Sequence, residues 1–177
     1  TAQYTLSLHD ALPISTTTAE LITAINNANA AGGTNTIVLA DATFDITTVN
    51  NYWYGPTGLP PITSNLTIRN DGNGATIQRN TAAPNFRLFY VAGGNTSVGP
   101  AGAGTLTLMN VTLKNGIARG GNGGANSGGG GGLGAGGAIY NQGALNLYRV
   151  TLTANTARGG DGGSDDDDSG EQDGRLF

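Results

Sequence analysis

Two stretches of this chain are near copies of each other. Residues 104–124 read GTLTLMNVTLKNGIARGGNGG and residues 143–163 read GALNLYRVTLTANTARGGDGG, so that 12 of 21 positions are identical at an offset of 39 residues. The earlier SNLTIRN, around Leu66 and Ile68, fits the same pattern one repeat upstream. Self-similarity at such a period is typical of a solenoid, in which each unit buries its apolar face by stacking on its neighbours. We therefore expect like residues to stack on like in parallel strands about 4.8 Å apart.

Apolar residues after position 36 occur in short bursts, each bounded by Gly, Asn, Asp or Pro, which is the pattern of short strands separated by turns. The composition agrees, because the chain has 31 Gly and only 11% charged residues. Its polar positions are filled mainly by Thr, Asn and Ser, which suit turns and exposed strand faces. We expect an all-β fold with strands at residues 37–39, 44–46, 66–68, 76–77, 88–91, 106–108, 111–113, 138–140, 145–147 and 150–152.

Alternation within the two repeat copies separates an inward from an outward face. Leu106 and Leu108 match Leu145 and Leu147, and these leucines fall on one face of their strands. Thr107 lies between two of them and falls on the other face. The pattern predicts that Leu147 is buried between stacked units and that Thr107 is exposed.

A helix is expected ahead of the strands. Thr17 and Glu20 have the spacing of a capping box, in which a hydroxyl and a carboxylate satisfy free amides of the first helical turn. Leu21, Ile22, Ile25 and Ala28 then share one face, and Gly32-Gly33 supplies the stop. We expect a helix over residues 19–31, within an N-terminal segment 16–34 that caps the open end of the strand array of residues 35–163.

The glycine tract between the two repeat copies, GGNGGANSGGGGGLGAGG at residues 120–137, has almost no side chains to pack. We expect it to be a flexible loop that leaves one corner of the array, since loop length costs little stability. A phosphate-binding interpretation fails because no Lys-Ser or Lys-Thr pair follows the tract.

The first residues do not read as part of the fold. Residues 4–14, YTLSLHDALPI, are what one frame of a widely used short-read sequencing adapter encodes, and the alternative is a native strand with an Asp-Ala-Leu-Pro turn. We treat residues 1–15 as foreign, which removes His9, the one histidine of the chain, from the catalytic candidates. The chain is then expected to be a fragment of a longer protein whose start, with any signal peptide, is missing.

The last residues, 164–177, carry an acidic run at 165–168, and much of the net charge of −4 lies there. We expect a disordered acidic tail, with loose Ca²⁺ binding as the alternative. The repeat pattern stops at Gly163 with no further strand or polar cap behind it. The strand array is therefore expected to be truncated at its C-terminal end.

The stretch GGAIYNQGALNLYRVTLTAN, residues 136–155, resembles the repeat of bacterial right-handed parallel β-helix surface proteins. These include the chlamydial polymorphic outer-membrane proteins, whose units carry GGA followed by Ile, Leu or Val and then Phe-x-x-Asn. Gly136-Gly137-Ala138-Ile139 matches the first element, and Leu152-Thr153-Ala154-Asn155 matches the second with Leu in place of Phe. The resemblance covers residues 17–163. It implies a right-handed parallel β-helix in an extracellular or outer-membrane protein that acts as an adhesin-like or structural stalk.

Many parallel β-helices cleave acidic polysaccharides, so the alternative is the N-terminal part of a lyase or hydrolase whose catalytic repeats are missing. Such enzymes need paired carboxylates, or carboxylates that hold Ca²⁺ against a uronate. Between residues 17 and 160 the acids are Glu20 in the cap and Asp41, Asp45 and Asp71, which stand singly beside turns and form neither kind of site. No catalytic residue, metal ligand or cofactor is expected, and a non-enzymatic role is favoured.

One aromatic cluster, Tyr52, Trp53 and Tyr54, is the candidate carbohydrate-binding site. Exposed rings would form a platform on which sugars stack, whereas buried rings would close the array under a loop. The expected partner is a surface polysaccharide or a ligand on a host or neighbouring cell. Nucleic acid is not expected, because the chain has no basic patch with interleaved aromatics, and no stretch is long and apolar enough for a transmembrane helix.

Overall fold

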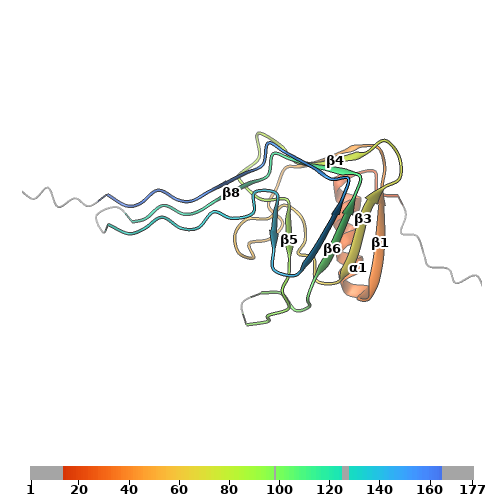
Figure 1. Cartoon of the computed structure of the whole chain (residues 1–177), viewed down its shortest axis with the longest axis horizontal. Helices are drawn as coiled ribbons and strands as arrows, with labels where there is room; N and C mark the ends of the chain where they lie inside the picture. Colours follow the sequence, from red (N-terminus) through yellow and green to blue (C-terminus); the bar gives the residue numbers. More distant parts are fainter. Residues whose placement is uncertain (1–13, 98, 125–127, 165–177) are drawn as a thin grey trace, which may run out of the picture.

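The computed structural model describes residues 14–97, 99–124 and 128–164. The adapter-like residues 4–13 and the acidic run 165–168 lie outside the described residues. In the described part, one helix precedes a series of short strands (Figure 1). The elements are α1 (Thr18–Ala31), β1 (Thr34–Leu39), β2 (Thr43–Ile46), β3 (Asn65–Asn70), β4 (Ala75–Arg79), β5 (Phe89–Val91), β6 (Thr105–Met109), β7 (Val111–Lys114), β8 (Ile117–Arg119), β9 (Ile139–Asn141), β10 (Ala144–Tyr148), β11 (Thr151–Thr153) and β12 (Thr156–Arg158).

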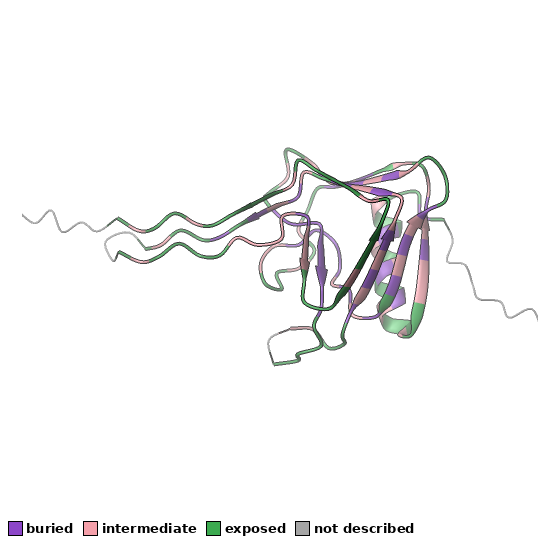
Figure 2. Ribbon diagram, viewed as in Figure 1, coloured by how far each residue is buried: buried purple, intermediate pink, exposed green. Residues whose placement is uncertain are grey.

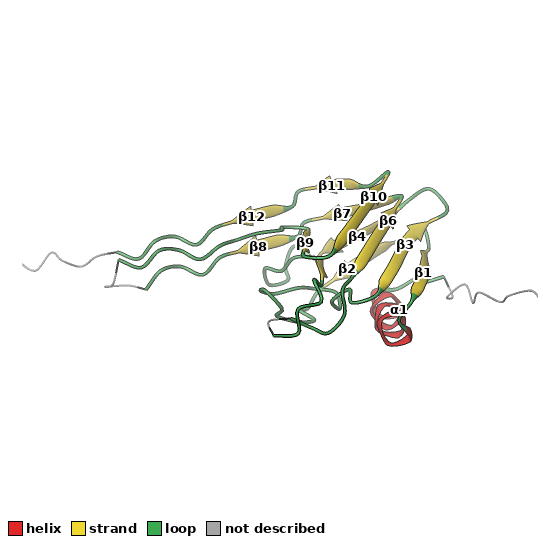
Figure 3. Cartoon of the chain, turned by 60° about the horizontal axis from the view of Figure 1, so that its bottom comes forward, coloured by secondary structure: helices red, strands yellow, loops and turns green. Residues whose placement is uncertain are grey.

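Every pairing between these strands is parallel. One sheet has the order β1-β3-β6-β10 and a second has the order β2-β4-β7-β11, while β5 pairs with β9 and β8 with β12 (Figure 3). The strands of one sheet are therefore far apart in sequence, and each connection passes through another sheet. The expected architecture of parallel strands preceded by one helix is confirmed at this level.

The register follows the sequence repeat. Leu106 pairs with Leu145 and Leu108 with Leu147, which is the offset of 39 residues that the two copies predict. On the other side of β6, Leu66 pairs with Leu106, so the upstream SNLTIRN does occupy the equivalent strand. Identical or similar side chains thus lie above one another in three successive strands.

The core lies between the sheets and consists of the alternate residues that point inward. In β3 and β6 the apolar positions are fully buried while the Thr positions between them are half-buried (Figure 2). Burying a Leu, Ile or Phe side chain of this size contributes about 1.5–3 kcal/mol. The buried set includes Ile37, Leu39, Phe44, Ile46, Leu66, Ile68, Ile77, Phe86, Leu88, Phe89, Val91, Leu106, Leu108 and Leu113.

Helix α1 begins as the sequence predicts. The Thr17 hydroxyl accepts a hydrogen bond from the Glu20 amide, and the Glu20 carboxylate accepts one from the Thr17 amide, which completes the capping box. The helix ends at Gly32, whose φ of 63° lies in the left-handed region. Leu21, Ile25 and Ala28 are buried and belong to the same core cluster as the residues of β1 and β2.

Ser15, the last residue of the segment that the sequence predicts to be foreign, takes part in the fold. Its amide donates to the Val38 carbonyl and its carbonyl accepts from the Ala40 amide, beyond the outer edge of β1. The side chain is buried, with 3% exposed. The folded part therefore begins at or before this residue.

Turns between strands are held by stacked polar side chains. Asp41 accepts a hydrogen bond from the Asn70 side chain at 2.8 Å, and Asn70 in turn accepts one from the Asn110 side chain at 3.1 Å. Asn110 has a φ of 54°, a left-handed conformation that Asn tolerates better than most residues. The same corner of three successive strands is thus fixed by one ladder of amide and carboxylate groups.

The last repeat unit does not bury its apolar face. Leu147 is 41% exposed and Leu152 is 53% exposed, and together with Ile139 and Leu145 they line an open cavity of about 450 Å³. The prediction that Leu147 is buried is wrong, because it stacks on Leu108 but no strand of the described chain lies on its other side.

The described residues of the glycine tract, for which the sequence predicts a flexible loop, form an extended arm. Three extended segments, 119–124, 128–135 and 158–164, run together away from the body of the molecule; we call them the glycine arm (Figure 1). The third segment follows β12, which the sequence interpretation missed, as it did β8. The arm is therefore built from both repeat copies and not only from the tract at 120–137.

Backbone hydrogen bonds join the three segments in a closed cycle. Gly120 and Gly123 donate to the third segment, Gly160 and Gly163 donate to the second, and Gly132 of the second donates to the first, over distances of 2.7–2.9 Å. The donors in the first and third segments are three residues apart, which matches the three-residue turn of a polyproline II helix. As in collagen, only a glycine fits where such extended backbones meet.

Replacing one inward-facing glycine of the arm by alanine is expected to separate the three segments of the arm from one another. A Cβ on Gly160 would lie 1.8 Å from the Gly121 carbonyl oxygen, whereas a Cβ on Gly130 would meet nothing within 4 Å. In the Gly160→Ala variant we expect NMR order parameters of the arm amides to fall from about 0.85 to below about 0.6, with the strands of the body unchanged. The Gly130→Ala variant should keep the arm ordered. Equal behaviour of the two variants would contradict this packing.

Candidate functional site

The aromatic cluster lies in a turn that backbone hydrogen bonds close. The amide of Thr57 donates to the Asn51 carbonyl at 2.8 Å, and the amide of Gly55 donates to the Tyr52 carbonyl at 3.1 Å. Tyr52 is 73% exposed, Trp53 41% and Tyr54 39%. The structure therefore agrees with the alternative in which the residues of this cluster are exposed, and not with the one in which they are buried.

Tyr54 connects the turn to two tyrosines of the body. Its ring centroid lies 5.6 Å from that of Tyr90 on β5 and 5.5 Å from that of Tyr140 on β9, which is the range of favourable aromatic pairs. Tyr90 donates a hydrogen bond from its hydroxyl to Gln142 Oε1 at 2.9 Å. Burial raises the pKa of Tyr90, and the neighbouring Tyr54 and Tyr140 raise it further, so this phenol stays protonated.

Arg87 lies beside this group of tyrosines. Its guanidinium carbon is 4.9 Å from the Tyr140 ring centroid, a cation–π distance. Only 5% of the residue is exposed, and burial lowers the pKa of Arg87 while Tyr140 raises it in part. Arginine nevertheless remains charged in proteins. The site thus contains a buried positive charge next to three aromatic rings.

A cavity of about 390 Å³ opens between the tyrosine turn and the base of the glycine arm. Its walls come from the turn, from the stretch before β5 and from β8 and the arm. They include Tyr54, Pro56, Asn85, Arg87, Arg119 and Leu133. Cavities of about 300–1,000 Å³ with apolar walls and a few polar groups are typical ligand sites.

The four acidic residues that the sequence assigns to the helix cap and to turns are engaged in local structure. Hydrogen bonds from the Asn73 amide and from the Asn70 side chain lower the pKa of Asp41, and bonds from the Thr16 amide and hydroxyl lower the pKa of Glu20. Asp45 accepts from the side chains of Gln78 and Asn80. Asp71 forms an exposed ion pair with Arg69 at 2.7 Å. None of these carboxylates faces the cavity.

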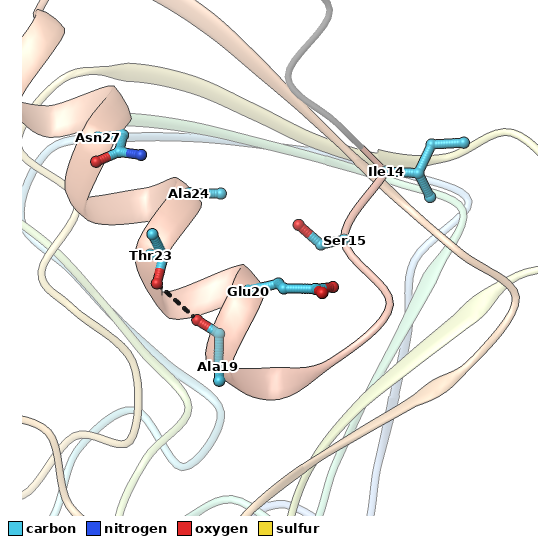
Figure 4. A pocket seen from close by; sticks show the side chains of 7 residues that line it. All are labelled: Ile14, Ser15, Ala19, Glu20, Thr23, Ala24 and Asn27. Atoms are coloured by element: carbon cyan, nitrogen blue, oxygen red, sulfur yellow. Dashed lines mark hydrogen bonds between the residues drawn. The ribbon is translucent and has the colours of Figure 1, made fainter.

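A second hollow of about 350 Å³ lies on the outer side of α1, between the helix and residues 14–15 (Figure 4). Two of its polar groups take part in the helix itself: Glu20 caps the helix, and Thr23 donates to the Ala19 carbonyl at 3.0 Å. In the described residues no group of three or more His, Cys, Asp or Glu side chains could hold a metal ion. The cavity at Arg87 is therefore the candidate site.

Sequence reasoning identified the tyrosine turn but missed Arg87, Tyr90 and Tyr140. Tyr90 and Tyr140 are partners in the β5–β9 register, and they lie 50 residues apart, not at the period of 39. An Arg inside the apolar run FRLFYV, residues 86–91, was the available signal, because Arg is seldom buried without a partner.

No protein-family model matches the sequence, and neither a curated protein nor a solved structure gives a match. Among the described helices, none is long and apolar enough to cross a membrane.

Proposed function

We propose that the chain is part of a right-handed parallel β-helix that serves as an adhesin-like or structural stalk, extracellular or at the outer membrane of a bacterium. The observation that carries the proposal is the in-register pairing of the two 21-residue copies over three strands, β6 on β10, β7 on β11 and β8 on β12. A unit that stacks on its own copy extends the molecule along one axis.

Such an array suits a stiff spacer. The inner strands of the two four-stranded sheets, β3, β6, β4 and β7, are each hydrogen-bonded to a strand on both sides, and the core residues stack on like residues. The corners are fixed by side-chain ladders such as Asp41, Asn70 and Asn110. Bending would break many of these contacts together, so the backbone resists it.

The adhesive part of the proposal is supported by the exposed rings of Tyr52 and Trp53 and by the cavity beneath Tyr54. Aromatic faces bind the apolar faces of sugar rings, and exposed apolar groups that cluster mark interaction sites. A surface polysaccharide or a ligand on a neighbouring cell is the partner that fits. The alternative of a lyase or hydrolase gains no support from the acids, which are tied into turns.

Insertion of extra repeats tests the stalk. Three further copies of residues 104–142, placed after Gln142, are expected to lengthen the particle by about 14 Å, since parallel strands are about 4.8 Å apart. Small-angle X-ray scattering would measure the longest dimension, and circular dichroism would show that the strand content rises in proportion. A variant that becomes wider without becoming longer would contradict the proposal.

The location is tested separately. In cells that produce the native protein, added protease is expected to cleave it on intact cells, while a cytoplasmic protein in the same cells stays uncut. Cleavage only after lysis would contradict a place at the cell surface.

A further inference from the structure

We infer that Arg87 and Tyr54 form a binding site for the carboxylate of an acidic sugar, a uronate unit of a polysaccharide, in the cavity at the base of the glycine arm. This inference deepens the adhesive part of the proposed function and rests on it. It names the chemical class of the ligand and the residue that selects it.

The first support is the contrast between two buried arginines. Arg79 is 6% exposed and donates from its guanidinium to the carbonyls of Asn115, Asn80, Ala83 and Pro84. Arg87 is 5% exposed, yet its Nε and Nη1 have no hydrogen-bond partner in the described part of the chain. Buried polar groups are nearly always paired, and one that is not calls for an unseen partner. The fold thus pairs the guanidinium of Arg79, whereas it leaves two buried nitrogen atoms of Arg87 without a protein partner.

The second support is the charge around the cavity. Arg87 and Arg119 both line it, and among the described lining residues none is acidic. The ion pairs of the described chain join Arg119 and Arg158 to Asp161 and Arg69 to Asp71, and none involves Arg87. The planar guanidinium matches a carboxylate with two parallel hydrogen bonds. An anion is therefore the ligand that this wall of the cavity selects.

The third support is the aromatic wall, which selects a sugar among the anions. Tyr54 lines the same cavity as Arg87, and 39% of the residue is exposed. A pyranose ring can lie on such a face while its carboxylate points toward the arginine. The cavity of about 390 Å³ is large enough for one sugar unit. Trp53 stands next to Tyr54 in the same turn and is 41% exposed.

Titration with three probes tests the site in the full chain. Trigalacturonate, its methyl ester and sodium acetate supply a sugar with a carboxylate, a sugar without one and a carboxylate without a sugar. Fluorescence of Trp53, the only tryptophan, and calorimetry report binding. We expect saturable binding of trigalacturonate, with the ester and acetate each weaker by about tenfold or more. No saturable binding of trigalacturonate, or equal binding of the ester, would overturn the inference, and acetate binding as well as trigalacturonate would overturn the part played by Tyr54.

Substitution of the two buried arginines provides the matched control. Arg87→Met is expected to abolish trigalacturonate binding and to leave the melting temperature of the free protein unchanged or higher, because it removes an unpaired buried charge. Arg79→Met is expected to lower the melting temperature, because it leaves carbonyl groups unsatisfied. If Arg87 served only to stack on Tyr140, Arg87→Met would lower the melting temperature and trigalacturonate would not bind the wild-type protein.

Failure of this inference can be distinguished from failure of the proposed stalk. If trigalacturonate does not bind but the repeat-insertion variant lengthens as expected, the stalk proposal stands and the sugar site is ruled out. If trigalacturonate binds but the inserted repeats do not lengthen the particle, the sugar site stands and the stalk proposal is ruled out.

Discussion

Leu108→Ala is expected to lower the free energy of unfolding by about 2–5 kcal/mol, the range for a buried leucine whose cavity cannot collapse. Leu108 is fully buried and lies in β6 between Ile68 of β3 and Leu147 of β10. The backbones above and below are fixed by parallel hydrogen bonds, so they cannot close over the space that the substitution leaves. Urea unfolding followed by circular dichroism measures the change.

Two control variants show whether stacking is the cause. Leu147→Ala removes the same side chain from the uncovered end of the same stack, where 41% is already exposed, and should cost less than about 2 kcal/mol. Thr107→Ala removes a half-buried outward side chain that accepts one hydrogen bond from Asn146 at 3.3 Å, and should cost about 0.5 kcal/mol. Equal costs for the Leu108 and Leu147 variants would show that the two residues do not belong to one ordered stack.

The difference between these two leucines marks a limit of sequence reasoning. The repeat predicted the register, because Leu106, Leu108, Leu145 and Leu147 recur at one offset and pair as that offset requires. Burial, in contrast, depends on whether a further unit lies above, and nothing within the unit itself encodes that. Leu147 therefore has the sequence surroundings of a core residue and the exposure of an end residue.

The glycine arm shows a second limit. Because glycine has no side chain that can pack, the sequence predicts that the glycine tract is a flexible loop. In the arm, the missing Cβ atoms let backbones approach closely enough to hydrogen-bond, as at Gly120 and Gly123, whose Cβ atoms would lie 2.0 Å from carbonyl oxygens of the second segment. The spacing of three was present in the sequence, but its partners come from segments that only the fold brings together.

The candidate site combines both kinds of information. The tyrosine turn is visible in the sequence as an aromatic cluster in one short stretch. The surroundings of Arg87, in contrast, include Tyr54 and Tyr140, which belong to other parts of the chain. A buried charge without a partner is a property of a three-dimensional neighbourhood. The composition and spacing of the sequence could not predict it.

Ile25→Asp is expected to destabilise the protein by at least about 4 kcal/mol and to cause aggregation. The substitution removes a fully buried side chain of α1 from the core cluster, and it places a carboxylate among apolar groups, which adds the cost of burying an unpaired charge. Total stabilities are about 5–15 kcal/mol, so such a loss populates chains without the helix. Those chains expose the apolar faces of β1 and β2, which can then associate with another molecule.

Asn26→Asp is the matched control, because it adds the same charge one residue later at an exposed position of the same helix. It should change stability by about 0.5 kcal/mol or less and leave the protein monomeric in size-exclusion chromatography with light scattering.

Burial raises the pKa of the introduced carboxyl at position 25 in the folded state, so the loss of stability that it causes is largest above that folded pKa. The penalty shrinks as the pH falls from the folded pKa to the unfolded pKa, because the folded state binds a proton that the unfolded state does not. Below the unfolded pKa the carboxyl is neutral in both states, and the charge contributes no penalty. The difference between the two variants should therefore be smaller at pH 4 than at pH 7, about the range in which a buried carboxyl titrates. An Ile25→Asp protein that stays monomeric and as stable as Asn26→Asp would show that α1 does not cap the strand array.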